Sequence, residues 1–181
     1  YMFYYSGKNS TTWNIGNLSN WDTSKVTNME GMFDYAGYSS TTFDIGNLDN
    51  WNTSNVTSMG WMFKNAGYTT TTFNIGDLSN WNTSNVTNML AMFEYAGYSA
   101  TTFDIGNIGN WDISKTTDIG WMFHKAGINA TTFNIGNLSN WDTSNVTSMR
   151  AMFDSAGYNA PYSLDLSGWN VNNITDHDYF N

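Results

Sequence analysis

Residues 41–70 read TTFDIGNLDNWNTSNVTSMGWMFKNAGYTT, and most of the remaining chain consists of further copies of this unit. The next copy, TTFNIGDLSNWNTSNVTNMLAMFEYAGYSA, begins 30 residues later, and two more follow at the same interval. Tryptophan recurs at this spacing, at Trp21, Trp51, Trp81, Trp111 and Trp141. Self-similarity at a fixed period of this length is typical of solenoids and arrays, whose units bury a core only by stacking. We therefore expect one elongated array of about six turns.

The first half of each unit has the pattern of extended chain. Phe43 and Ile45 alternate with polar residues, which favours a short extended segment. Leu48, Trp51 and Thr53 then follow the L-x-x-L-x-L spacing of a leucine-rich repeat, with Trp and Thr in the second and third places. Along an extended run, Trp51 and Thr53 point to one side and the polar residues between them to the other. We expect these runs to form a parallel sheet on one face of the array.

The second half of each unit has the pattern of a helix. Val56, Met59 and Phe63 stand at positions i, i+3 and i+7, which places them on one stripe of an α-helix. Thr57 can cap its first turn, and Gly67 can end it in a left-handed conformation. Together the two halves predict an α/β repeat solenoid, with a parallel β-sheet on one face and short helices on the other.

The repeats end in a variant unit. We interpret residues 1–157 as stacked 30-residue repeats, and residue 1 falls in the middle of a repeat, so the N-terminal edge looks truncated. After Gly157 the spacing shortens by two residues, the chain's only proline, Pro161, appears, and Asp176-His177-Asp178 replaces the methionine pattern. Terminal repeats of solenoids are atypical because they must close the core. Residues 158–181 are therefore expected to act as a C-terminal cap.

Composition excludes several classes of partner. The net charge is −9, from six Lys and Arg against fifteen Asp and Glu. Such a surface repels phosphate backbones and anionic lipid, so we expect no nucleic-acid partner. No apolar run is long enough to span a bilayer, which argues against direct membrane insertion. The chain contains no cysteine, so neither a disulfide framework nor a thiolate nucleophile is possible.

The motif WDTSNVTSMRAMF, residues 141–153, resembles the repeats of the BspA-like leucine-rich-repeat group of bacterial surface proteins, W-D-x-S-x-V-x-x-M-x-x-M-F. The resemblance extends over five copies and a variant sixth at residues 169–180, although the unit here is a few residues longer around G-Y-x-x-T-T-F. It implies a right-handed solenoid on an exported, surface-attached bacterial protein with a role in adhesion or partner binding. It implies no catalytic residues.

No catalytic, metal or cofactor site is expected. The two histidines, His124 and His177, occur in unrelated contexts, and no known hydrolase, zinc-protease or P-loop motif is present. The column formed by Asp22, Asp112 and Asp142 also contains asparagines, which favours a solvated hydrogen-bonding ladder over paired catalytic carboxylates. We therefore do not expect an enzyme.

Two surfaces are candidates for ligand binding. The first is a polar ladder on the outer side of the predicted sheet, which suits sugar hydroxyls or peptide backbone unless its side chains only bond to one another; it comprises Asn50, Asn52, Ser54, Asn80, Asn82, Ser84, Asn110, Asp112 and Ser114. The second is a set of aromatic residues expected to point away from the core, Trp61 and Trp121 with Tyr35 and Tyr95. Exposed aromatic groups in a row can mark an interaction site, or they can pack on one another.

These observations lead to one functional hypothesis and two alternatives. We expect a non-enzymatic, extracellular repeat domain on a bacterial cell surface that binds a host, matrix or cell-surface protein or glycan. The first alternative is a structural spacer that presents another domain and has no ligand of its own. The second is ice binding through the threonine pairs at residues 11–12, 41–42, 71–72, 101–102 and 131–132. Adjacent residues of a strand face opposite ways, so the two threonines of a pair cannot form one flat surface, which argues against this alternative.

Overall fold

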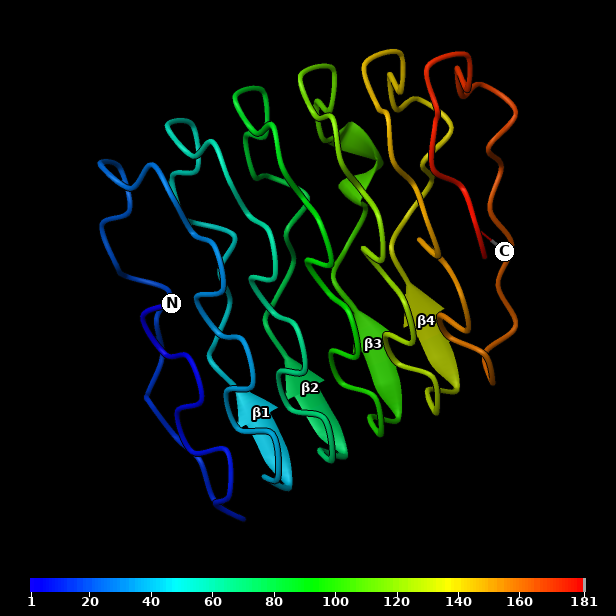
Figure 1. Cartoon of the computed structure of the whole chain (residues 1–181). Helices are drawn as coiled ribbons and strands as arrows, with labels where there is room; N and C mark the ends of the chain where they lie inside the picture. The colour runs from blue at the N-terminus through cyan, green and yellow to red at the C-terminus, as the bar shows by residue number, and fades with distance from the viewer. Residues whose placement is uncertain (181) are drawn as a thin grey trace.

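A computed structural model describes residues 1–180, in which the chain winds into a row of stacked coils with the two termini at opposite ends (Figure 1). Most of each coil is irregular backbone and turns. Four short strands and one 3₁₀ turn are present in the described part of the chain: β1 (Thr42–Asp44), β2 (Thr72–Asn74), β3 (Thr102–Asp104), η1 (Ile108–Asn110) and β4 (Thr132–Asn134). The strands occupy the same position in successive units. The predicted 30-residue structural period is therefore confirmed.

The strands pair in parallel, but they lie earlier in the repeat than the leucine-rich-repeat spacing predicted. β1 pairs with β2 and β3 pairs with β4, with Phe43 opposite Phe73 and Phe103 opposite Phe133. The middle residue of each strand is buried and its two neighbours are exposed, as the period-two pattern around Phe43 predicted. The expected sheet through residues 50–54 was wrong. That segment is not a strand in any coil.

Residues 50–54 nevertheless keep the predicted inward and outward alternation. Trp51 and Thr53 are buried, and Asn52 between them is exposed. These buried side chains bond to neighbouring coils directly: the indole N–H of Trp51 donates to the Leu18 carbonyl at 2.9 Å, and the Thr53 hydroxyl donates to the Asn82 carbonyl at 3.0 Å. The contact between coils is therefore made by side chains here, where a sheet would use backbone bonds.

The predicted helices were also wrong, since residues 1–180 contain no α-helix. The backbone N–H groups of Met59, Trp61 and Phe63 donate to carbonyls of the next coil, 29 residues ahead, at 2.8–2.9 Å. An α-helix would direct these donors to carbonyls four residues back in the same segment. Trp61 also has a positive φ of 56°, which a right-handed helix does not allow. The fold is thus a repeat solenoid of stacked turns and short parallel strands, not an α/β leucine-rich repeat.

The helix-like spacing of apolar residues has a different cause. The segment is a series of tight turns, in which the N–H groups of Met62, Lys64 and Ala66 each donate to the carbonyl three residues earlier. A series of such turns returns side chains to the interior every three or four residues, as a helix does. Met59, Met62, Phe63 and Ala66 are accordingly all buried, and Thr57, the expected helix cap, instead donates its hydroxyl to the Thr27 carbonyl of the preceding coil. The spacing alone could not separate the two conformations.

Aromatic residues stack through the core from coil to coil. Phe63, Phe93 and Phe123 lie in one column with ring centroids 5.4–5.5 Å apart and nearly parallel planes. A second column contains tryptophans, of which Trp51 and Trp81 are 6.3 Å apart. All of these side chains are buried. Because a buried Phe side chain contributes on the order of 2 kcal/mol, the repeated columns make a large contribution to stability.

A glycine in each coil allows close contact with the strand phenylalanine of the preceding coil, such as Phe43. Gly67 has a φ of +54°, and a Cβ at this position would lie 2.7 Å from the Cβ of Phe43. Any larger residue would be strained and would collide with the ring-bearing side chain of the preceding coil. Gly67 was expected to end a helix, but it ends a series of turns and makes room for Phe43.

Residues 158–180 form one more turn of the stack. Trp169 stacks on Trp141 at 5.9 Å, and its indole N–H donates to the Leu138 carbonyl at 2.8 Å, as the other core tryptophans do. The outer side of this turn leaves an apolar hollow of about 410 Å³, lined by Met149, Leu166, Trp169, Val171, Ile174, His177 and Phe180. A capping role for residues 158–181 stays a prediction, and residue 181 lies outside the described residues. No helix within residues 1–180 has the length and apolarity needed to cross a lipid bilayer.

Candidate functional site

Two surface hollows are lined by residues in or next to β1, β2 and β3. One hollow of about 600 Å³ is lined by residues from three consecutive coils: Thr11, Thr12, Trp13, Asn14, Gly16, Asn17, Thr41, Thr42, Asp44, Gly46 and Asn74. A second, of about 320 Å³, is lined by Asn74, Gly76, Asp77, Asp104 and Gly106. Asn74 lines both, so the two hollows adjoin. We refer to them together as the strand-side groove.

Tight turns hold the polar side chains of the groove in place. At the end of β1, the Asp44 carboxylate accepts a hydrogen bond from the Gly46 N–H at 3.0 Å. The same turn recurs at Asn74 and Gly76, and at Asp104 and Gly106. Gly46 has a φ of +80°, and a Cβ there would lie 2.3 Å from the Asn17 side chain. The glycine therefore allows the turn to form and leaves room for an asparagine side chain of the neighbouring coil.

Acidic and amide side chains alternate along the groove. The Asn74 amide donates to Asp44 Oδ1 at 3.0 Å, and the Asn134 amide donates to Asp104 Oδ1 at 2.9 Å. Asp77 likewise accepts bonds from Ser79 through Oδ1. Within residues 1–180 the hydrogen bonds to these three carboxylates all reach Oδ1. The second oxygen of each remains an acceptor for water or for a ligand.

The polar ladder predicted from the sequence lies at another corner of the coils. Asn52 Oδ1 accepts bonds from the backbone N–H and the hydroxyl of Ser54 at 3.1 and 2.7 Å, and Asn82 does the same with Ser84. Asn50, Asn80 and Asn110 are exposed beside these turns. The side chains thus bond within their own coil and do not form a lattice across coils. Their role in ligand binding stays a prediction.

The same local turns lower the pKa of the aspartates that occupy the position of Asn52 in other coils. The hydroxyl and backbone N–H of Ser114 hydrogen-bond to Asp112 and lower the pKa of its carboxyl. Ser24 and Ser144 lower the pKa of Asp22 and Asp142 in the same way. These bonds favour the ionised form, because a carboxylate is the better acceptor. The carboxylates of this column act as turn-forming acceptors.

Trp61 and Trp121, expected to point away from the core, are half-buried. At their position the chain alternates large and small residues, and the alanines of the intervening coils, Ala91 and Ala151, are buried. Arg150 lies 5.5 Å from the Trp121 ring. Each indole is therefore flanked by a small residue in the next coil, and the two tryptophans do not form a continuous exposed row.

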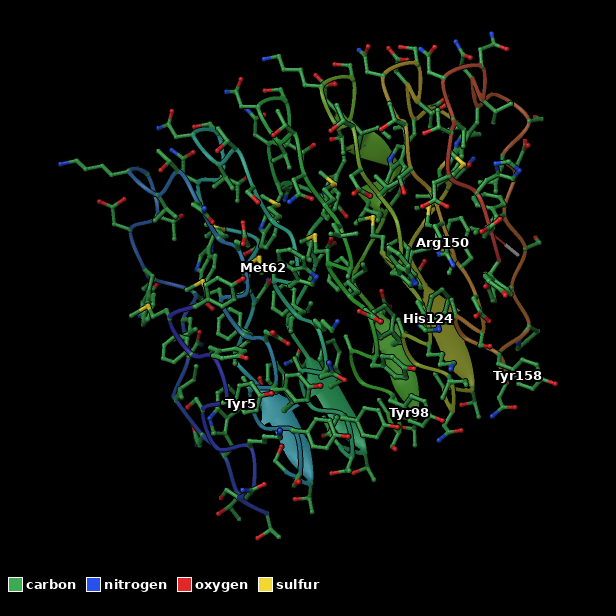
Figure 2. All side chains as sticks on the ribbon, in the orientation of Figure 1. Tyr5, Met62, Tyr98, His124, Arg150 and Tyr158 are labelled. Carbon is green, nitrogen blue, oxygen red and sulfur yellow. The ribbon has the colours of Figure 1, made fainter. Side chains whose placement is uncertain are left out.

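Tyr35 and Tyr95 belong to a larger group that the sequence pattern did not bring to attention. Six half-exposed tyrosines stack across four coils, and we call this group the tyrosine ladder: Tyr5, Tyr35, Tyr38, Tyr68, Tyr95 and Tyr98. Tyr5 and Tyr98, at the two ends of the tyrosine ladder, are labelled in Figure 2. A signal was available, because tyrosine follows the repeated Ala-Gly pair at residues 38, 68 and 98.

His124, labelled in Figure 2, lies in a column of polar and charged side chains and does not line either hollow of the groove. Its Nδ1 is 3.3 Å from Glu94 Oε1 and its Nε2 is 3.5 Å from Asp154 Oδ2, while Lys64 pairs with Glu94 at 2.7 Å. Burial tends to raise the pKa of Glu94, but the hydrogen bonds from His124 and Lys64 outweigh burial and lower it. The Lys64–Glu94 ion pair and the polar contacts of His124 therefore link adjacent coils. Within residues 1–180 no group of three or more His, Asp or Glu side chains is arranged to hold a metal ion.

The groove itself was not identified from the sequence. Phe43 and Ile45 were correctly placed facing inward. The outward Thr42 was considered only as part of a threonine pair for ice binding, and Asp44 was not considered as part of a binding surface. The available signal was Gly46, which stands two residues after the Asp or Asn in every copy. An Asx turn closed by glycine at each coil implies an exposed row of amide and carboxylate groups.

Comparisons with known proteins place the chain in a repeat family. Neither the curated proteins nor the solved structures contain a match to it. A family model described as Mycoplasma protein of unknown function, DUF285, matches residues 1–128 and, again, residues 98–180. Two overlapping matches are expected when a model spans several similar units. The chain therefore belongs to the repeat-containing family DUF285.

Proposed function

We propose that this chain is a non-enzymatic, extracellular binding domain of a bacterial surface protein, which holds an extended polar partner along the strand-side groove. The observation that carries the proposal is the continuity of the groove across coils, since Asn74 lines both of its hollows. Repeat proteins commonly bind along surfaces that run over several units. The resemblance to BspA-like surface repeats supports the extracellular location and the adhesive role.

The chemistry of the groove favours a ligand rich in hydrogen-bonding groups. Its lining consists mainly of threonine hydroxyls, amides and carboxylates, and three carboxylates keep one oxygen available. The backbone groups of the strands already bond between coils, so a partner must be recognised by side chains. With a net charge of −9, the chain disfavours anionic partners. A neutral or cationic glycan or peptide segment, from a host, matrix or cell-surface molecule, fits these conditions.

A spacer role is the second candidate. The same hydrogen bonds recur between successive coils, as shown by the tryptophan indoles that donate to the Leu18, Leu48 and Leu78 carbonyls. A stack with repeated bonds of this kind resists bending and can hold another domain away from a surface. This role requires no occupant of the groove.

A pair of matched variants separates the two candidates. Thr42→Arg places a long side chain in the lining of the larger hollow, and Thr72→Arg places a second at the equivalent exposed position of β2, two residues before Asn74. Thr57→Arg with Thr87→Arg makes the same chemical change at exposed positions of the same coils, outside the lining of either hollow. We expect the first pair to reduce binding to cells and to arrayed glycans by at least about tenfold, and the second pair to leave it near wild type.

The possible results have distinct meanings. Equal binding by wild type and both variants places the interaction outside the groove. No binding by wild type above a charge-matched control protein contradicts the binding hypothesis and favours the spacer. Circular dichroism of all three proteins checks that the substitutions leave the coils folded.

A further inference from the structure

The tyrosine ladder has a geometry suited to covalent coupling between coils. Tyr38 and Tyr68 have ring centroids 4.7 Å apart with an interplanar angle of 10°, and Tyr68 and Tyr98 are 4.5 Å apart at 14°. Each pair comes from equivalent positions of adjacent coils, so the backbone holds the rings together. All three are half-buried, which leaves part of each ring in contact with solvent.

From this geometry we propose that Tyr38, Tyr68 and Tyr98 form an oxidative modification site, at which neighbouring rings couple into dityrosine and so join adjacent coils covalently. The oxidant is hydrogen peroxide acting through a haem peroxidase. Each of two phenols loses one electron and one proton, and the two phenoxyl radicals form a carbon–carbon bond between positions ortho to their hydroxyls. The ring hydrogens then move to the oxygens, and the peroxide takes up two electrons and two protons to give two molecules of water.

The positions of the rings make coupling within one molecule faster than coupling between molecules. Two groups held in contact react as if at a very high local concentration, because no encounter in solution is needed. Burial raises the pKa of Tyr68, so its phenol carries no charge at physiological pH that would repel a neighbouring ring. The chain has no cysteine that would be oxidised first or that could supply a disulfide.

The positive charge of Lys8 limits the expected coupling to the middle of the tyrosine ladder. The Lys8 ammonium lies 4.1 Å from the ring centroid of Tyr5 and 4.5 Å from that of Tyr35, but 5.9 Å from that of Tyr38. A cation close to a ring disfavours the removal of an electron from that ring. Although Tyr5 and Tyr35 are also stacked at 4.7 Å, coupling should therefore favour Tyr38–Tyr68 and Tyr68–Tyr98.

The test treats the dilute protein with peroxide and peroxidase, isolates the monomer by size exclusion, and measures its dityrosine fluorescence. Trypsin cuts after Lys64, which lies between Tyr38 and Tyr68, so a Tyr38–Tyr68 bond joins the peptides 26–64 and 65–115. A Tyr68–Tyr98 bond lies within peptide 65–115 and lowers its mass by two hydrogen atoms. Detection of either product in the monomer supports the proposal.

Matched variants identify the reacting rings. Tyr68→Phe keeps the stacked ring but removes the phenol common to both pairs, and we expect it to lower monomer fluorescence several-fold. Tyr158→Phe is the control, because Tyr158 is 75% exposed and the adjacent coil has Ile128 at the same position (Figure 2). It should leave the fluorescence unchanged. Lys8→Gln should add a product that joins peptides containing Tyr5 and Tyr35.

Two results would overturn the proposal. One is dityrosine found only in dimers and larger species, which would show that exposed tyrosines of separate molecules react instead. The other is a monomer signal that Tyr68→Phe does not reduce. Fragment spectra of the wild-type tryptic peptides, which separate Tyr68 from Tyr95 and Tyr98 within peptide 65–115, decide the matter even if a variant is poorly folded. The coupled monomer should also unfold at a higher temperature than the untreated protein, because the new bond closes a loop across one coil.

Discussion

The buried phenylalanine column and the tyrosine ladder place aromatic rings at the same interval along the stack, yet they differ in what the stacking achieves. Phe63 and Phe93 are 5.5 Å apart at an interplanar angle of 5°, and Tyr68 and Tyr98 are 4.5 Å apart at 14°. The phenylalanines are fully buried, whereas the tyrosines are half-exposed. Regular spacing follows from the coil repeat in both cases, but only the buried column removes whole side chains from water.

The difference shows that a stacked column is not by itself a measure of stability. A ring within the core contacts other side chains on every side, and its removal leaves a cavity that the neighbouring coils cannot fill. A ring in the tyrosine ladder contacts its neighbours through its faces and meets solvent at its edge. We therefore expect the first column to stabilise the fold and the second to be largely available for chemistry.

The largest expected effect is on the buried column. Phe93→Ala should lower the free energy of unfolding by about 3–5 kcal/mol, because it leaves a cavity at the centre of the core. Tyr68→Ala should lower it by only about 1 kcal/mol, the contribution of aromatic pairing at a partly exposed position. Chemical denaturation of both variants and the wild type gives the two values. Equal losses would contradict the distinction between the columns.

The next effect concerns the glycines that let the buried rings of adjacent coils approach. Gly97 has a φ of +51°, and a Cβ there would lie 2.9 Å from Cγ of Phe73, so Gly97→Ala should cost about 2–4 kcal/mol from strain and overpacking together. Gly16 has a φ of +77°, and a methyl group at its Cα would meet no atom within 4 Å. Gly16→Ala should therefore cost only about 1 kcal/mol, from backbone strain alone. Thermal or chemical unfolding compares them, and a similar loss in both would mean that close packing against Phe73 contributes little.

The smallest expected effect is a change of stability with pH that depends on Asp34. In the sequence this residue stands between Phe33 of the phenylalanine column and Tyr35 of the tyrosine ladder. Burial raises the pKa of Asp34 to about 6, with Lys64 lowering it and Glu94 raising it further, and Oδ1 has no hydrogen-bond partner within residues 1–180. A carboxyl whose pKa is higher in the folded state than its usual value near 4 binds its proton more tightly when folded. The contribution of Asp34 to stability should therefore fall as pH rises from about 4 to about 6, and stay lower above that range.

Asp34→Asn keeps the shape of the side chain and removes its titration. The variant should be more stable than the wild type at pH 7 by about 1–3 kcal/mol, and the difference should disappear below pH of about 4. Denaturation of both proteins between these pH values measures it, and the subtraction removes the contribution of the other acidic groups. A difference that does not change with pH would contradict the assignment to Asp34.

Several features of the fold followed from the residues of one repeat. The 30-residue period, the burial of Trp51, Phe43 and Phe63, and the parallel alignment of successive units were all predicted, because apolar residues at fixed spacing must be sealed between copies of themselves. The exposure of Asn52 beside the buried Trp51 also followed from simple alternation. These predictions depend only on which residues avoid water and how often they recur.

The backbone conformation and the surface depended on contacts between coils. The spacing of Met59 and Phe63 fits a helix or a series of turns equally well, and the turns form because the next coil offers carbonyl acceptors to the N–H groups of Met59, Trp61 and Phe63. The strand-side groove and the tyrosine ladder likewise arise only where side chains of different coils meet. A sequence read one unit at a time contains no information on these partners, which lie about 30 residues away in the chain and one coil away in space.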